Sequence, residues 1–199
     1  MLYYNLNTKN MKMNFKKIAL IIALATVGTF SAKAQISIGG SLNINSPLSD
    51  FGDSKTGFKT GFGIGLQGRY DLNDNMKVGV NTGYYSFTNQ LSDKITFRII
   101  PVVAVFDYYF MTEGIKPYVG LDLGMYLGQT SIDGKTDGID ATNKFGIAPH
   151  AGVAYEVNDV IDVFGNLGYN MIFNKDDAKG EKDITYLAIN LGVSYSFDK

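Results

Sequence analysis

Alternation of apolar side chains with small or polar ones along residues 116–128, KPYVGLDLGMYLG, constrains the fold of this chain more than any other feature. From Val119 to Leu127 every second residue is aliphatic or methionine, and the residues between them are Gly, Asp or Tyr. Successive side chains of a β-strand point to opposite faces, so this segment predicts a strand with one aliphatic face. From Tyr118 to Gly128 the opposite face carries a single charge, Asp122, and therefore suits a crowded interior better than bulk water.

The same period-two pattern recurs in eight segments after residue 34, and no stretch of useful length there shows helical periodicity. We expect strands at residues 35–45, 58–72, 76–88, 95–110, 116–128, 145–157, 160–173 and 185–197. Residues 95–110, ITFRIIPVVAVFDYYF, are apolar on both faces, so their register is open. Pro101 cannot donate to a strand ladder and predicts a bulge within this segment.

The connections between these segments alternate in length. Mostly longer stretches rich in Asp, Lys, Gly and Asn follow the odd-numbered segments, and shorter turns follow the even-numbered ones. Outer-membrane barrels show this asymmetry, and a sheet crosses a bilayer only when it is closed. We therefore predict an all-β protein: an eight-stranded antiparallel transmembrane up-and-down β-barrel over residues 35–199, in the outer membrane of a Gram-negative cell. The competing fold is a secreted soluble barrel of lipocalin type, which would need many more Lys and Glu on one face.

The first 34 residues predict a cleaved secretory signal peptide. A basic start, an apolar run and an A-x-A cleavage pattern follow one another, at Lys16 and Lys17, at about 18–30, and at Ala32 and Ala34. The alternative is a membrane anchor, but the apolar run is too short to span comfortably. Met13 is an alternative start of the chain. Without residues 1–34 the chain has 13 basic and 19 acidic residues, a net charge of −6, which disfavours nucleic acid as a partner.

In a closed barrel the aliphatic faces turn to lipid, and the other faces fill an interior with little spare room. In the two clearest strands we expect the lipid-facing residues to be Val119, Leu121, Leu123, Leu127, Leu187, Ile189, Leu191 and Val193. Charged groups that point inward must pair, because an unpaired buried charge is costly. We expect a polar network in the lumen that comprises Arg69, Arg98, Asp122, His150, Glu156 and Asp162.

Aromatic residues gather near the ends of the predicted strands and predict two girdles at the lipid interfaces. Those towards the long connections are Tyr84, Tyr85, Tyr126, Tyr169 and Tyr186. Those towards the short turns are Tyr70, Tyr108, Tyr109, Phe110, Tyr155 and Tyr195.

Four segments carry a resemblance to a known family: AKAQ at the signal end, PYVGLDLGMYLG, FGIAPHAGVAYEV and the final LGVSYSF. Together they resemble the outer membrane protein β-barrel family of small porin-like and OmpA/OmpX-type barrels, and the signal and ending are similar to members from Bacteroidota. The resemblance implies insertion by the outer-membrane assembly machinery, which reads a C-terminal aromatic strand. Tyr195 and Phe197 would supply that signal, although Asp198 and Lys199 follow where many members end on the aromatic residue itself.

Three motifs suggest other chemistry, and each fits poorly. GIGLQG at 63–68 has the glycine spacing of a dinucleotide loop, but it lies inside a predicted strand and does not open a helix. DGKTDGID at 133–140 is similar to a calcium loop, but Lys135 and Lys144 stand where acids are required. His150 is the only histidine, which excludes multi-histidine metal sites.

These patterns predict no catalytic residue, no metal site and no cofactor. The leading hypothesis is a structural or surface-interaction protein, expected as a monomer in contact with outer-membrane lipid and lipopolysaccharide, whose long loops bind a host or cell-surface ligand. The alternative is a narrow passive porin-like channel. A third, remoter alternative is an outer-membrane lipid-modifying enzyme. Lipid A deacylases pair a His with a Ser two positions on, and Gly152 stands at that position here.

Overall fold

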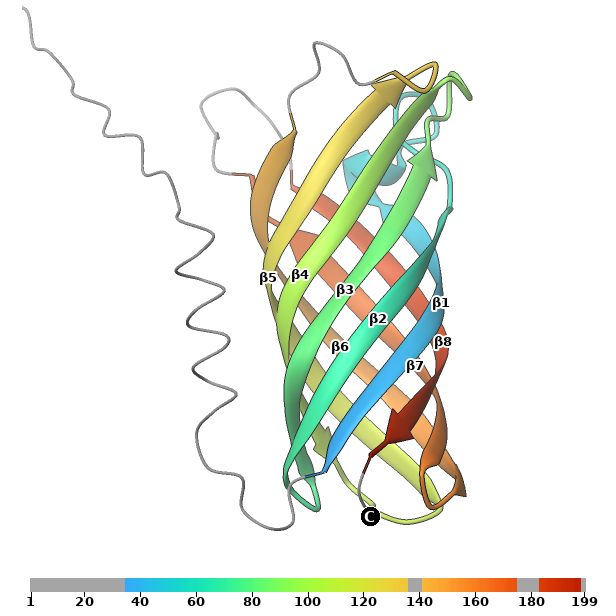
Figure 1. Ribbon diagram of the computed structural model, residues 1–199. Helices are drawn as coiled ribbons and strands as arrows, with labels where there is room; N and C mark the ends of the chain where they lie inside the picture. Colours follow the sequence, from blue (N-terminus) through green and yellow to red (C-terminus); the bar gives the residue numbers. More distant parts are fainter. Residues whose placement is uncertain (1–34, 136–140, 175–182, 198–199) are drawn as a thin grey trace, which may run out of the picture. The chain divides into compact units, whose positions relative to one another are not determined.

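The computed structural model describes residues 35–135, 141–174 and 183–197, which form a closed β-barrel (Figure 1). Its eight strands are β1 Ile36–Leu48, β2 Gly61–Asn73, β3 Met76–Thr88, β4 Ile95–Tyr109, β5 Ile115–Ile132, β6 Thr142–Asn158, β7 Ile161–Ile172 and β8 Ile184–Ser196. Each strand pairs antiparallel with the next, and β8 pairs with β1 to close the sheet. The predicted fold class is confirmed, while the predicted signal peptide and its cleavage residues Ala32 and Ala34 lie outside the described residues.

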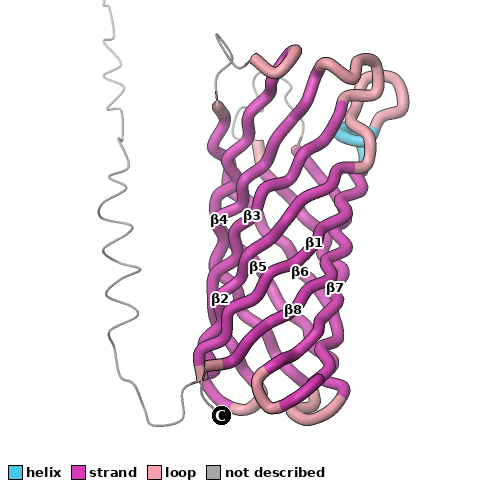
Figure 2. The backbone as a smooth tube through the Cα atoms, turned by 45° about the vertical axis from the view of Figure 1, so that its right-hand side comes forward, coloured by secondary structure: helices cyan, strands magenta, loops and turns pink. Residues whose placement is uncertain are grey.

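The barrel has two unlike ends, which are named here by their connections. The loop end carries the connections β1–β2, β3–β4, β5–β6 and β7–β8, and the turn end carries the tight turns β2–β3, β4–β5 and β6–β7 (Figure 2). A short 3-10 helix, η1 Ser49–Gly52, lies in the β1–β2 loop. Within the described residues, no helix has the length and apolar character needed to cross a membrane.

The strands at the centre of the sequence are longer than the alternation predicted. β5 has 18 residues and β6 has 17, and their pairing extends to Gly128 and Thr142. The bulge predicted at Pro101 is wrong: Pro101 pairs with Tyr126 in the same register as its neighbours on β5. The register shifts occur instead beside two of the tight turns, between Asp71 and Asn73 and between Glu156 and Asn158.

Apolar side chains cover the outer wall of the barrel, and small or polar side chains fill its lumen. Leu42 is 70% exposed and Leu66 64%, whereas inward Asn45 and Asp107 are almost fully buried. Some inward positions have room only for glycine. A Cβ atom on Gly192 would overlap the carbonyl oxygen of Gly40 and the ring of Phe164. The narrow lumen of an eight-stranded barrel thus accounts for the glycines of the inward face.

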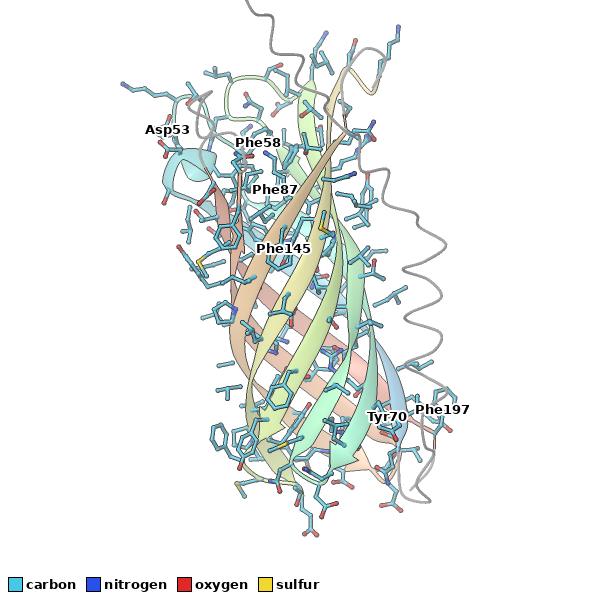
Figure 3. All side chains as sticks on the ribbon, turned by 90° about the vertical axis from the view of Figure 1, so that its left-hand side faces the viewer. Asp53, Phe58, Tyr70, Phe87, Phe145 and Phe197 are labelled. Carbon is cyan, nitrogen blue, oxygen red and sulfur yellow. The ribbon has the colours of Figure 1, made fainter. Side chains whose placement is uncertain are left out.

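The aromatic girdles are less populated than the sequence predicted. Tyr126 and Tyr186 are buried inside the barrel, and Tyr85 and Tyr109 share the inward face of their strands, so these four leave the predicted girdles. Tyr84 and Tyr169 lie on the outer wall towards the loop end, and Tyr108 and Tyr155 lie there towards the turn end. Figure 3 shows Tyr70 and Phe197 at the turn end, and Phe58 and Phe87 at the loop end.

Candidate functional site

Asp107 on β4 is the centre of a buried ionic network in the lumen. One carboxylate oxygen accepts a hydrogen bond of 2.7 Å from Arg69 Nε on β2, and the other lies 2.7 Å from His150 Nε2 on β6. The side chains of Arg69, Asp107 and His150 are 7%, 2% and 6% exposed, so the network is shielded from solvent. Three strands far apart in the sequence are therefore linked across the barrel interior.

Asp122 on β5 extends this network on the far side of the imidazole. Its Oδ1 atom lies 3.2 Å from His150 Nδ1, and its Oδ2 atom accepts a hydrogen bond of 3.1 Å from Asn81 Nδ2. Asn81 Oδ1 in turn accepts a 2.7 Å hydrogen bond from Arg69. Both ring nitrogens of His150 face carboxylates, an arrangement that a doubly protonated imidazole satisfies by donating in both directions.

Gly120 makes room for this contact between Asp107 and His150. A Cβ atom at position 120 would overlap the Asp107 carboxylate and the His150 ring. The glycine is therefore required by the close approach of the ionic groups and not by an unusual backbone angle.

A second ionic cluster lies towards the turn end. Lys116 Nζ on β5 lies 2.7 Å from both carboxylate oxygens of Asp162 and 3.8 Å from Glu156 Oε2. Lys77 and Asp71 form a further pair at 3.1 Å. With the central network, these pairs neutralise most of the charge that points into the lumen.

Amide side chains fill the part of the lumen beside β1, β7 and β8. Asn43 donates to Asn190, Asn190 donates to Asn166 at 2.6 Å, and Asn166 donates to the Tyr118 hydroxyl at 3.0 Å. A polar cavity of about 50 Å³ remains between this chain and the Asp122–His150 contact. Such a volume holds about three to five water molecules, because one water needs about 10–15 Å³ of this space.

Apolar side chains close the lumen at the loop end. Phe51 from η1 packs against Phe58, Phe87 and Phe97, with ring centroids 5.1, 5.2 and 5.9 Å apart. Phe87 is fully buried and also contacts Tyr186 at 5.6 Å. We call this cluster of Phe51, Phe58, Phe87, Phe97 and Tyr186 the aromatic lid. Residues 46–57 were expected only as the long connection between the predicted strands 35–45 and 58–72, so the inward position of Phe51 was missed.

The β1–β2 loop is fastened to the β3–β4 loop next to the aromatic lid. Asn89 Nδ2 donates to the carbonyl of Gly57 at 3.0 Å, and the backbone nitrogen of Gln90 donates to the same carbonyl at 2.9 Å. Lys59 donates to Asp93 at 2.8 Å, and this hydrogen bond lowers the pKa of the exposed Asp93 carboxyl. Two of the four loops therefore form one hydrogen-bonded surface.

The structure brings together five of the six residues expected in the lumen network. Arg69, Asp122 and His150 join the central network, and Glu156 and Asp162 contact Lys116. The expectation for Arg98 is corrected: it shares the outer face of β4 with exposed Ile100, whereas neighbouring Phe97 and Ile99 are buried. Alternation had no clear phase in this strand because both of its faces are apolar.

Two central residues, Asp107 and Lys116, were missed. Asp107 lies nine positions after Arg98 in the same strand, so the two side chains must face opposite sides of an unbroken strand. Because residues 95–110 are apolar on both faces and a bulge was expected at Pro101, the sequence did not show which of the two side chains points inward. Lys116 shares its parity with Tyr118 and Asp122, so the alternation could have placed it inside the barrel.

The predicted outer face of β5 and β8 lies on the outer wall. Six of its residues are 39–60% exposed: Val119, Leu121, Leu123, Ile189, Leu191 and Val193. Leu127 and Leu187 lie on the same faces and are half-buried. Tyr195 and Phe197 are exposed beside the seam between β8 and β1, where the Phe197 nitrogen donates to Ile36.

The glycine motif at 63–68 has a structural role, and the segment similar to a calcium loop at 133–140 lies partly outside the described residues. The glycines of 63–68 lie within β2, which continues as a strand to Asn73 and opens no helix. Asp133 and Gly134 adopt positive φ in the turn after β5, and residues 136–140 of the segment similar to a calcium loop are outside the described residues. No group of three metal-ligating side chains occurs among the described residues.

A closed antiparallel barrel with an apolar outer wall and a packed polar lumen defines the class of small integral outer-membrane β-barrels. The family model for the outer membrane protein beta-barrel domain matches residues 18–197. The chain therefore belongs to this family and is a protein of the Gram-negative outer membrane. A search among curated protein sequences finds no significant match.

Solved structures of similar fold come from several bacteria. Neisserial surface protein A superposes with a TM-score of 0.66 at 20% identity, covering 81% of this chain and 97% of that one. Ail, the attachment invasion locus protein of Yersinia pestis, was solved with the heparin analogue sucrose octasulfate. It superposes with a TM-score of 0.54 at 19% identity, covering 82% and 99%. OprG from Pseudomonas aeruginosa superposes with a TM-score of 0.53 at 16% identity, covering 83% and 96%. At these identities the likeness concerns the fold.

Proposed function

We propose that this protein acts at the cell surface as a structural or surface-interaction barrel, with its long loops as the functional part and its lumen as a support. The observation that carries the proposal is the sealed lumen. The aromatic lid closes the loop end, and the Asp107–Arg69–His150 network fills the middle. A passive channel needs an open path, and wide water-filled lumens belong to barrels of about sixteen or more strands.

The outer wall supports an orientation in the membrane with the long loops outside. Outer-membrane barrels place short turns in the periplasm and longer loops outside the cell. In this orientation the aliphatic residues of β5 and β8 contact lipid. We also propose that Tyr195 and Phe197 are read by the assembly machinery, since they lie at the turn end beside the closing seam of the barrel. We expect a monomer, because the barrel leaves no strand edge unpaired.

The charge of the loops constrains the ligand that they would bind. Residues 49–60, 89–94, 133–141 and 173–183 together contain ten acidic and seven basic residues, a net charge of −3. The crystallised Ail complex holds a polyanion, the heparin analogue. A loop set with net negative charge repels a polyanion, so we propose a ligand of neutral or positive charge on a host or neighbouring cell.

Shortened loops test the surface role. Residues 133–141 are replaced by Asn-Gly, which leaves the β5–β6 pairs at Gly128 and Thr142 in place. The matched control replaces the turn at 74–75 by Asn-Gly. We expect the loop variant to keep its heat-modifiable band and to lose attachment of expressing cells to host or bacterial surfaces, while the control keeps both. Equal attachment after shortening each of the four loops would contradict the proposal.

Planar-bilayer conductance of the refolded protein tests the sealed lumen. We expect no reproducible current steps from protein that migrates as a compact folded band. Reproducible steps that shift with Asp122→Asn would overturn the sealed-lumen argument and favour a channel. A non-enzymatic role is part of the proposal. It would be reversed if the protein hydrolysed lipid A or phospholipid and His150→Ala abolished that activity.

A further inference from the structure

Arg98 is the one charged side chain on the outward-facing positions of the described strands. Among those positions, the rest are aliphatic, aromatic, small or uncharged polar residues. The Arg98 guanidinium has no ion-pair or hydrogen-bond partner among the described residues. A cation on a lipid-facing wall is costly in mid-bilayer, by about 2–4 kcal/mol, and costs about 0–1 kcal/mol near the interface. Its depth in the membrane therefore decides whether it is tolerated.

On the outer face of β4, Arg98 lies next to the membrane-crossing segment, on its loop-end side. Below it, towards the turn end, outward residues from Ile100 to Tyr108 are apolar or aromatic, with Val102 and Phe106 exposed between them. This segment spans residues 100–108, close to the ~9–11 residues with which a tilted strand crosses the hydrocarbon. Thr96 is the only outward strand residue beyond Arg98 on β4. Arg98 thus lies at the outer interface, where lipid headgroups are found.

Two polar side chains flank Arg98 in register on the neighbouring strands. Ser86 of β3 pairs with Arg98 on one side, and Gln129 of β5 pairs with it on the other. Directly opposed residues of an antiparallel sheet have Cβ atoms about 4.5–5.5 Å apart, so the three side chains are neighbours. The row towards the turn end changes to Tyr84, Ile100 and Leu127, which are apolar or amphipathic. The polar row therefore marks the upper border of the apolar belt on β3–β5.

We propose that Arg98, with Ser86 and Gln129, binds a phosphate group of an outer-leaflet glycolipid of the lipopolysaccharide type. A guanidinium forms bidentate charge-assisted hydrogen bonds with phosphate, and the serine hydroxyl and glutamine amide add two uncharged donors. The adjoining ends of the β3–β4 and β5–β6 loops, where the Asp133 nitrogen donates to the Lys94 carbonyl at 2.8 Å, carry no net charge: Lys94 and Lys135 are balanced by Asp93 and Asp133. The inference rests on the proposed orientation with the long loops outside.

Native mass spectrometry of the detergent-folded mature barrel tests this site. The probes are bisphosphorylated lipid A, the same lipid with both phosphates removed, and inorganic phosphate. The variants are Arg98→Gln, Arg98→Lys and the loop control Lys94→Gln. We expect Arg98→Gln to weaken binding of bisphosphorylated lipid A about tenfold, the effect of losing about one charge-assisted hydrogen bond. Arg98→Lys is expected to recover part of the loss, and Lys94→Gln to change binding less than twofold.

Three outcomes separate the proposal from its rivals. Removal of the phosphates should weaken binding to the wild type as much as Arg98→Gln does, and should not weaken binding to Arg98→Gln further. Equal affinities of wild type and Arg98→Gln would overturn the proposal. Competition by inorganic phosphate at the same molar concentration as the lipid would overturn it in favour of a site for free phosphate. The loop-shortening and conductance experiments do not depend on Arg98. They can therefore contradict the proposed surface role without affecting the test of the lipid site.

Discussion

Removal of the Asp107 carboxylate is expected to destabilise the barrel more than any single change at an exposed ion pair. In Asp107→Asn one acceptor oxygen remains for Arg69, while the new NH₂ group faces the His150 nitrogen that donated to the carboxylate. Asp107 accepts both contacts at 2.7 Å, and its side chain is 2% exposed. The variant therefore leaves the buried Arg69 guanidinium without a carboxylate partner and removes one of the two carboxylates that face His150.

The expected loss follows from the two contacts. A hydrogen bond to a charged group contributes about 1.5–3 kcal/mol, and breaking a buried ion pair on one side costs about 3–5 kcal/mol. We expect Asp107→Asn to lower the free energy of unfolding by about 3–5 kcal/mol. The matched control is Asp93→Asn, because Asp93 forms an ion pair with Lys59 at 2.8 Å while its side chain is 82% exposed. Water screens an ion pair at so exposed a site, so we expect Asp93→Asn to unfold at the same urea concentration as the wild type.

The assay is reversible urea unfolding of the mature protein folded into lipid vesicles. The chain contains no tryptophan, so the transition is followed by far-UV circular dichroism and by the gel shift between folded and unfolded bands. A change below about 1 kcal/mol in Asp107→Asn, similar to Asp93→Asn, would refute the view that this network stabilises the lumen.

Three further predictions use the same preparation. Leu191→Arg places a charge on an outer-wall position that is 60% exposed, and should lower the free energy of unfolding in vesicles by about 2–4 kcal/mol. Unchanged stability and membrane assembly would show that this face does not contact lipid. Gly120→Ala should lower the free energy of unfolding by about 1–3 kcal/mol, because the added methyl group crowds the Asp107–His150 contact. Its control Gly68→Ala meets only a side-chain atom 3.8 Å away and should be close to neutral in the same urea transition. Phe51→Ala should make residues 49–60 sensitive to protease. It should still give no current steps in a planar bilayer, because the ionic network closes the lumen below the aromatic lid. Current steps would show that the aromatic lid alone closes the lumen.

The sequence alone predicted the number of strands, their order, the unlike ends of the barrel and the facing of most side chains. The physical reason is that a two-sided wall requires strict period-two alternation, and seven of the eight segments show that alternation clearly. The exception is β4, which is apolar on both faces because its inward residues Phe97, Ile99, Val103 and Val105 belong to the same apolar cluster as Phe51, Phe87 and Tyr186 of the aromatic lid. Its phase was therefore ambiguous, and the assignment of Arg98 was wrong.

Tertiary structure alone decided which inward groups meet. Alternation places a side chain inside the barrel but does not set its height, which depends on the register of every strand pair around the closed sheet. The contacts of Asp107 with Arg69 and His150 join residues 38 and 43 positions apart in the sequence. The return of Phe51 into the barrel mouth depends on the path of the β1–β2 loop, which no period in the sequence encodes. The local pattern thus determined the outer wall of the barrel. Closure of the sheet and packing in its lumen determined the ionic network and the aromatic lid that fill it.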